Sequence, residues 1–174
     1  MHDPAWVGPF EQAELMCRKD IITYISEPLE EDLEIAGYVK LILFVSSNVL
    51  DTDFCAKICD MRPSGLTYNL QAGFVRMRYR ESLHMPSLIE PGKIYRLEIF
   101  LRSIAHAFLK NHRIQLQVTS CDFPVHDRNL NTGESCEFST EIKIAEQTIY
   151  TGEQYPSHLI LPVIGKDVRM KDEG

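Results

Sequence analysis

The stretch that decides the fold is Ala105–Gly133, AHAFLKNHRIQLQVTSCDFPVHDRNLNTG. In its middle, Arg113–Ser120, apolar and polar side chains alternate, so that Ile114, Leu116 and Val118 share one side of the chain. This period of two predicts a strand with one buried face. The rest of the stretch is rich in Pro, Asp, Asn and Gly, which favour turns. A core strand followed by a long polar loop is typical of β-domains that display function at one end.

Short apolar runs separated by turn residues predict strands along most of the chain. A turn at Arg62–Gly65 is expected to close a hairpin, and Glu11–Arg18 has a short helical character. So many short strands predict an all-β fold, a sandwich or jelly roll. The further predicted strands are Ile21–Ile25, Tyr38–Ser46, Phe54–Asp60, Leu66–Leu70, Val75–Arg80, Ile94–Leu101, Phe138–Ile144, Thr148–Tyr150 and His158–Val163.

The predicted strand Tyr38–Ser46 is apolar on both faces, because Ile42 and Phe44 lie opposite its regular core-facing residues. A strand of this kind is covered on both sides. Either it is central in its sheet, or its second face meets another domain or subunit. The second alternative predicts that the isolated chain self-associates through Ile42 and Phe44.

The chain of 174 residues is long enough for one domain with a sizeable core. We expect a lead-in segment at 1–20, a jelly-roll domain at 21–164 and a tail at 165–174. The net charge of -7 argues against nucleic-acid and anionic-membrane partners. An odd number of cysteines and the lack of a signal-peptide pattern predict reduced thiols and a cytoplasmic location. No apolar run reaches the about 20 residues that span a bilayer.

The closest approach to a serine nucleophile is Gly133-Glu134-Ser135-Cys136-Glu137. A nucleophile elbow requires a second glycine where Glu137 stands, and a sharp turn from a strand to a helix. The predicted surroundings of Ser135 are a loop and a strand. We therefore assign no nucleophile.

A calcium loop is suggested by the alternating oxygen ligands of Asp127, Asn129 and Asn131. However, its glycine falls one position late at Gly133, and the twelfth position holds Phe138 where a Glu is needed. We therefore interpret these side chains as bonding their own backbone in turns.

The cysteines and histidines give no catalytic or metal-binding pattern. Cys55 and Cys59 lie about 13 Å apart at the rise of a strand, too far for one zinc ion. His106, His112 and His126 have no nearby carboxylate and nucleophile in a pattern that would make any of them a base. Packed or surface imidazoles are the simpler interpretation.

The row Arg76, Arg78 and Arg80 could bind an anion, but we prefer a solvated or salt-bridged strand face, because one such row in an acidic protein is a weak signal. Asp51 and Asp53 could supply carboxylates to a cation, and we interpret them instead as caps of a turn. We assign no catalytic, cofactor-binding or metal-binding residue, and no cofactor.

Taken in order, four stretches resemble the C-terminal domain of the X-Pro dipeptidyl-peptidase and cocaine-esterase (CocE/NonD) family of serine hydrolases. Their order and number make the resemblance specific. They are DLEIAGYVKLILFVSSNVLDTDFCAKICDMRPSG (Asp32–Gly65), VRMRYRESL (Val75–Leu83), EPGKIYRLEIFL (Glu90–Leu101) and the stretch Ala105–Gly133 quoted above.

The resemblance implies a galactose-binding-like jelly roll. It also implies that full-length members carry an α/β-hydrolase domain and a helical cap, with the Ser, Asp and His triad in the hydrolase domain. None of those catalytic positions has a counterpart here. Where the family has Gly before a conserved His, this chain has Asn111, which tolerates positive φ.

Two functions follow. In the first, the chain is the accessory domain of such a hydrolase, packing on the hydrolase domain, shaping its substrate pocket and supporting a homo-oligomer. In the second, it is a stand-alone carbohydrate- or protein-binding module, an idea that rests on fold analogy. The single tryptophan, Trp6, lies in the lead-in segment and offers no aromatic platform for a sugar. We favour the first.

Overall fold

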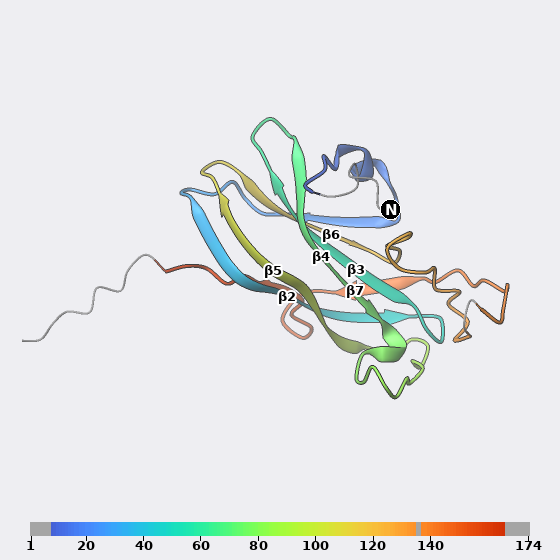
Figure 1. Cartoon of the computed structure of the whole chain (residues 1–174). Coiled ribbons are helices and arrows are strands. Elements are labelled where there is room, and N and C mark those ends of the chain that lie inside the picture. Colours follow the sequence, from blue (N-terminus) through green and yellow to red (C-terminus); the bar gives the residue numbers. More distant parts are fainter. Residues whose placement is uncertain (1–7, 135–136, 166–174) are drawn as a thin grey trace, which may run out of the picture.

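The computed structural model describes residues 8–134 and 137–165, and these form an almost entirely β structure (Figure 1). No helix in this part of the chain has the length and apolar character needed to cross a membrane. The elements are the 3-10 helices η2 (Ala13–Cys17) and η3 (Met77–Tyr79) and the strands β1 (Ile21–Ile25), β2 (Leu33–Ser47), β3 (Asp53–Met61), β4 (Thr67–Arg76), β5 (Tyr95–Phe108), β6 (Arg113–Thr119), β7 (Gln147–Tyr150) and β8 (His158–Ile160).

The strands form two antiparallel sheets. The first has the order β1-β6-β3-β4, and in the second β2 pairs with β5 on one side and with both β7 and β8 on the other. Alternating side chains from the two inner faces meet between the sheets and form one core, as in other sandwiches. The all-β sandwich predicted from the sequence is therefore confirmed, while its finer assignment as a jelly roll stays a prediction.

The core contains the inward-facing residues of the long strands. Each large aliphatic or aromatic side chain that is fully buried contributes about 1.5–3 kcal/mol relative to exposure. The large, fully buried residues of this core include Ile35, Val39, Leu41, Leu43, Phe54, Ile58, Met77, Leu97, Ile99, Leu101 and Phe108.

The predicted hairpin at Arg62–Gly65 is confirmed, and so is the backbone expected at Asn111. The connection from β5 to β6, which passes from one sheet to the other, places Asn111 at a φ of 67°, the conformation expected for a residue that replaces glycine. The turn Arg62–Gly65 joins β3 to β4, and the Arg62 amide donates to the Leu66 carbonyl across it. The predicted helical piece at 11–18 is present as the 3-10 helix η2.

One predicted strand is correct only for its first two residues, and another is absent. Val75–Arg80 leaves the sheet after Arg76, because the Met77 amide donates to the Thr52 carbonyl and the chain turns into η3. Within Phe138–Ile144, no strand forms. Phe138 and Ile144 alternate with polar residues but have no face to cover, and both are highly exposed.

The strand with two apolar faces is central, which confirms the first of the two alternatives. Ile42 is only 2 % exposed, and the Phe44 ring lies 5.7 Å from the Tyr155 ring. The chain thus covers this face itself with the β7–β8 connection. The expectation that Ile42 and Phe44 lie open for self-association is therefore wrong.

The two lateral edges of the sandwich differ. At one edge β4 meets β5 so closely that a Cβ on Gly73 would lie 2.4 Å from the Phe100 carbonyl oxygen. We call this the closed edge. At the other edge β1 faces β7 and β8 across an apolar cavity, and we call this the open edge.

Candidate functional site

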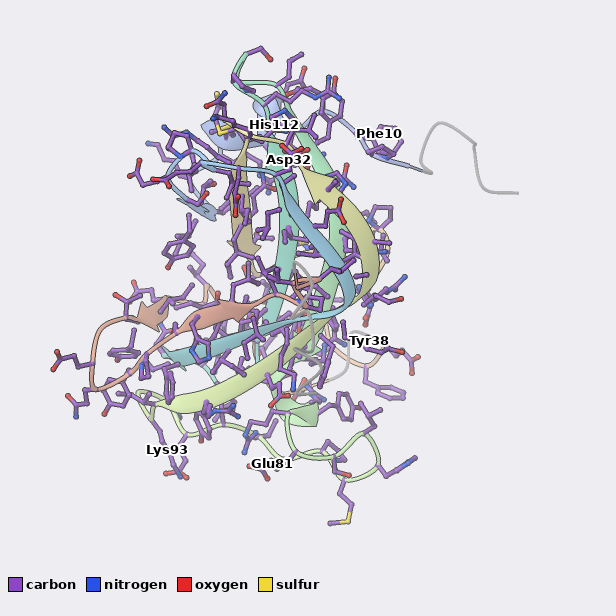
Figure 2. All side chains as sticks on the ribbon, turned by 90° about the vertical axis from the view of Figure 1, so that its left-hand side faces the viewer. Phe10, Asp32, Tyr38, Glu81, Lys93 and His112 are labelled. Carbon is purple, nitrogen blue, oxygen red and sulfur yellow. The ribbon has the colours of Figure 1, made fainter. Side chains whose placement is uncertain are left out.

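Three connections gather at the end of the sandwich where β2 runs into β3, and we call this region the loop end. They are residues 48–52, 80–94 and 120–146. Figure 2 shows Glu81 and Lys93 at this end, whereas Asp32 and His112 lie at the opposite one. Long loops on a rigid sheet scaffold are the usual place for function in a β-domain.

A buried polar cluster, which we call the carboxylate network, lies at the base of the loop end. Asp51 and Asp53 are 0 % and 2 % exposed. Arg76 donates to both oxygens of Asp53 at 2.9 and 3.0 Å, and Arg78 donates from its Nε to Asp51 at 2.7 Å. The Asn129 side-chain amide bridges the two carboxylates at 2.9 and 2.7 Å.

Pairing and burial shift the pKa values of Arg76 and Asp53 in this network. Hydrogen bonding to Asp53 raises the pKa of Arg76, so its guanidinium stays charged. Burial raises the pKa of Asp53 despite the opposing hydrogen bonds from Arg76 and Asn129. Buried charges of this kind are tolerated only while they stay paired, and breaking such a pair costs far more than the pair contributes.

Each arginine of the row Arg76, Arg78 and Arg80 forms hydrogen bonds with a neighbouring segment of the chain. Arg76 also donates to Asp127 of the long loop, at 2.9 Å to its carbonyl and 3.1 Å to its carboxylate. Arg80 donates to the Ser87 carbonyl at 2.7 Å, and Arg78 holds the β2–β3 turn. The salt-bridged interpretation of the row is therefore confirmed, although two of its members lie beyond the strand.

The turn-cap interpretation is correct for Asn129 and wrong for the other four residues. Asn129 accepts from the Asn131 amide at 2.9 Å, which is an Asx turn. Asp51 and Asp53 instead accept from arginines and Asn129, and Asp127 pairs with Arg76. Asn131 donates its side-chain amide to the Lys143 carbonyl at 2.8 Å, across the loop. Within residues 8–134 and 137–165, no group of three His, Cys, Asp or Glu side chains is placed to hold a metal ion.

The loops expose apolar side chains at their tips. Exposed apolar side chains can mark a contact site for another protein surface where they gather in a patch. Seven large apolar residues in the described part of these loops are each exposed over more than half of their surface: Leu83, Met85, Phe123, Val125, Phe138, Ile142 and Ile144.

The histidines have partners that sequence reasoning missed. The Asp60 carboxylate forms hydrogen bonds with His106 Nε2 at 3.1 Å and with His112 Nδ1 at 2.8 Å, at the end of the sandwich opposite the loop end. His126 lies 3.0 Å from Asp122. The Asp60 contacts join distant segments and gave no sequence signal, whereas the spacing of four between Asp122 and His126 could have revealed that pair. In the part of the chain that the structure describes, no serine or cysteine side chain forms a hydrogen bond with these pairs, and we assign them structural roles.

The cysteines that the structure describes have no disulfide partner. Burial raises the pKa of Cys55, and it raises the pKa of Cys59 to about 12, so neither forms a thiolate readily. Both are structural residues of β3. Ser135 and Trp6, which the sequence analysis singled out, lie outside the described residues.

Comparison with known proteins identifies the family of this sandwich. The family described as "X-Pro dipeptidyl-peptidase C-terminal non-catalytic domain" matches residues 3–160. The chain belongs to this family. It is also 44 % identical over 159 residues to the cocaine esterase of Rhodococcus sp. (strain MB1 Bresler), covering 90 % of this chain and 28 % of that enzyme.

Solved structures agree with this membership. An aminopeptidase from a marine sediment Thaumarchaeota archaeon superposes with a TM-score of 0.84 at 31 % identity, over 89 % of this chain and 27 % of that one. An α-amino acid ester hydrolase superposes with a TM-score of 0.83 at 29 % identity, over 90 % and 27 %. The chain thus spans about 28 % of the length of the curated relative. The recognition made from the sequence is confirmed.

Proposed function

We propose that this C-terminal non-catalytic domain packs on an α/β-hydrolase domain through its loop end, and that the loop tips form part of the wall of the substrate pocket. The similar proteins are an esterase, an aminopeptidase and an ester hydrolase, which supports a hydrolase domain as the partner. A homo-oligomer, a cytoplasmic location and the boundaries 1–20, 21–164 and 165–174 belong to the same proposal.

One observation carries the proposal: the loop end is rigid at its base and apolar at its tips. The carboxylate network fixes residues 127–129 and the turn at 48–52 against β4. The loops that rise from this base expose Leu83, Met85 and Phe138. A preorganised apolar surface loses little conformational entropy when it binds, which favours a permanent domain contact.

The test uses a hybrid enzyme, in which this chain replaces the matching region of the Rhodococcus cocaine esterase. We expect the hybrid to hydrolyse its ester substrate, and the double variant Leu83→Ser, Met85→Ser to raise KM or lower kcat severalfold. Tyr38→Ser is the matched control, because Tyr38 is a highly exposed aromatic residue away from the loop end. Equal kinetics for the double variant and the control, with equal melting temperatures, would contradict the proposal.

The stand-alone carbohydrate- or protein-binding module remains a prediction from the sequence alone. No arrangement of side chains in the described residues favours it over the domain contact.

A further inference from the structure

The open edge has an unusual strand at its border. β1 pairs with β6 on one side and is the last strand of its sheet. Ile22 and Tyr24 point between the sheets, yet they remain 44 % and 38 % exposed. Ile21 and Thr23, on the outer side of β1, are half-buried, whereas Ile25 on that side is 43 % exposed. Ile22 and Tyr24 are therefore apolar side chains that point toward the core of the sandwich without being covered by it.

The backbone of β1 also has free hydrogen-bonding positions. The Ser26 amide donates to the Ile114 carbonyl at 3.0 Å, which places this pair in a hydrogen-bonded position of the β1–β6 ladder. Because such pairs alternate with non-bonded ones, Tyr24 and Ile22 also bond to β6. Thr23 and Ile25 therefore direct their N–H and C=O groups away from β6, toward the open edge.

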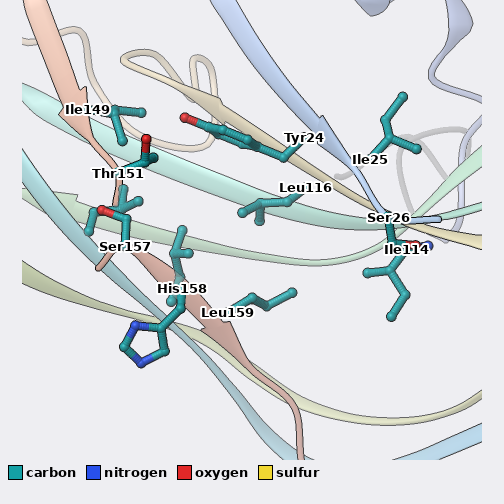
Figure 3. A pocket seen from close by; sticks show the side chains of 12 residues that line it. Tyr24, Ile25, Ser26, Ile114, Leu116, Ile149, Thr151, Ser157, His158 and Leu159 are labelled. Atoms are coloured by element: carbon teal, nitrogen blue, oxygen red, sulfur yellow. Dashed lines mark hydrogen bonds between the residues drawn. The ribbon is translucent and has the colours of Figure 1, made fainter. Parts of the chain in front are cut away.

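An apolar cavity of about 370 Å³ lies beside these positions. Figure 3 shows that β1 and β6 border it on one side, and β7 and β8 on the other. Its volume is within the range of about 300–1,000 Å³ that is usual for ligand sites. Its apolar lining includes Tyr24, Ile25, Leu43, Leu116, Ile149 and Leu159.

A second cavity of about 230 Å³ continues along the same strand. Ile22, Val118 and Phe54 line it, and Ile149 lines both cavities. Together they form a trough that follows the whole of β1. Five residues of strand extend about 17 Å, so the trough matches the length of an ordinary short strand.

The larger cavity of the trough offers few free polar groups to a ligand, whereas Lys19, Asp20 and Gln147 also line the second cavity. Ser157, the hydroxyl residue on its β8 side, already donates to the Tyr150 carbonyl at 2.6 Å and accepts from the Phe44 amide at 2.9 Å. Burial raises the pKa of Tyr24, so its hydroxyl stays neutral. An occupant would thus be recognised by apolar side chains in the trough and by main-chain groups along β1.

We propose that the open edge is a strand-acceptor site, which binds an extended segment with alternating apolar side chains. The segment pairs with Thr23 and Ile25 through its backbone and places every second side chain in the trough. This is strand addition, in which main-chain bonds give affinity and pockets give specificity. The inference rests on the proposed function, because the occupant comes from the polypeptide that longer relatives carry beside this region.

Two observations favour this occupant. The curated relative is 28 % covered by the match, so most of its polypeptide lies outside it and is available to supply a strand. In addition, the exposed inner face and the unpaired backbone lie on the same strand, as required for an added strand rather than a compact ligand.

The test uses overlapping ten-residue peptides that tile the part of the Rhodococcus cocaine esterase outside the match. Binding of each peptide to the full 174-residue chain is measured by fluorescence anisotropy. We expect one peptide, or a few overlapping ones, with alternating apolar residues to bind. The β1 amides of Thr23 and Ile25 should become protected from hydrogen exchange when it does.

The informative variant is Thr23→Pro, which removes an outward N–H and leaves the β6 ladder intact. We expect it to weaken peptide binding about tenfold, as loss of one or two main-chain hydrogen bonds requires. Thr23→Val keeps the N–H and is the matched control, with affinity unchanged. If Thr23→Pro fails to fold, Leu159→Glu tests the trough instead, because a charge there opposes an apolar occupant.

Three results would overturn the inference. The first is that no tiled peptide binds. The second is that binding is equal in Thr23→Pro and Thr23→Val. The third is a concentration-dependent dimer of the chain that Thr23→Pro disrupts, because the occupant would then be a second copy. The loop-end variants of the hybrid enzyme report separately on the proposed function, which stands if they act while Thr23→Pro has no effect.

Discussion

The closed and open edges of this sandwich join the same two sheets in opposite ways. At the closed edge, β4 lies against β5 with backbone near backbone, because Gly73 has no side chain to separate it from Phe100. At the open edge, Ile22 and Tyr24 of β1 face a trough that nothing in the described chain fills. The contrast shows which edge the chain completes by itself and which edge it leaves for another segment.

The difference follows from strand length and side-chain size. β4 and β5 have 10 and 14 residues, whereas β1 has 5 and β8 only 3. Long strands can curve across the sandwich and close it. The short ones at the open edge leave apolar side chains half-covered. We therefore expect substitutions at the closed edge to affect the isolated chain, and those at the open edge to affect it little.

The largest effect is expected for Arg76→Ala, at the end of β4. The variant leaves the Asp53 carboxyl buried without its cation, and the free energy of unfolding should fall by about 3–5 kcal/mol. Arg96→Ala is the control, because Arg96 forms only an exposed pair with Glu98 and should change stability by less than about 1 kcal/mol. Urea denaturation measures both, and equal losses would contradict the role given to the network.

The pH dependence of this variant has a definite sign. Burial raises the pKa of Asp53 in the fold, and an acid of this kind stabilises the fold while it is protonated. That contribution is lost as the pH rises through the folded value. Without Arg76 the pKa of Asp53 should rise further, so the loss in free energy of unfolding caused by Arg76→Ala should be smaller at pH 4 than at pH 7. A loss that grows as the pH falls would exclude this explanation.

Gly73→Ala is expected to cost less, about 1–3 kcal/mol, because its Cβ would push β4 away from the Phe100 carbonyl. Gly165→Ala is the matched control, since no atom lies within 4 Å of the Cβ position there and the backbone φ is ordinary. Thermal unfolding compares them. Similar melting temperatures for the two variants would mean that β4 and β5 can move apart at the closed edge without loss of stability.

The smallest effect is expected for Tyr24→Thr at the open edge. Thr keeps the β-propensity of the strand, and Tyr24 is already partly exposed. The isolated chain should lose less than about 1 kcal/mol. The same substitution should destabilise the hybrid enzyme more, because the trough is then filled. If Tyr24→Thr lowered the free energy of unfolding of the isolated chain as much as Gly73→Ala does, the two edges would not differ in the way described here.

The sequence predicted most of the strands because each long strand has its own period of two. Val75–Arg80 shows the limit of this signal. Its alternation continues past Arg76, but the buried Met77 is held by Thr52, a contact made in the fold and invisible in the pattern. Phe138–Ile144 alternates too, and no neighbouring strand exists there for it to pair with.

The carboxylate network could be predicted only in part. The sequence indicates that the arginine row is solvated or salt-bridged, but it favours a turn for Asp51 and Asp53 and does not pair them with Arg76 and Arg78. Moreover, the register shifts by one residue at a bulge between Ile58 and Cys59. Because a shift of one residue moves every side chain to the other face, the pairing of Asp53 with Arg76 needed the structure. The third member, Asn129, comes from a distant loop.

The most direct measurement of the central claim is amide hydrogen exchange along β1, in the isolated chain and in the hybrid enzyme. The account predicts that Thr23 and Ile25 exchange rapidly in the isolated chain while Tyr24 is protected by β6. In the hybrid, Thr23 and Ile25 should become protected as well. Rapid exchange at both residues in a folded, active hybrid would contradict the claim that the open edge receives a strand.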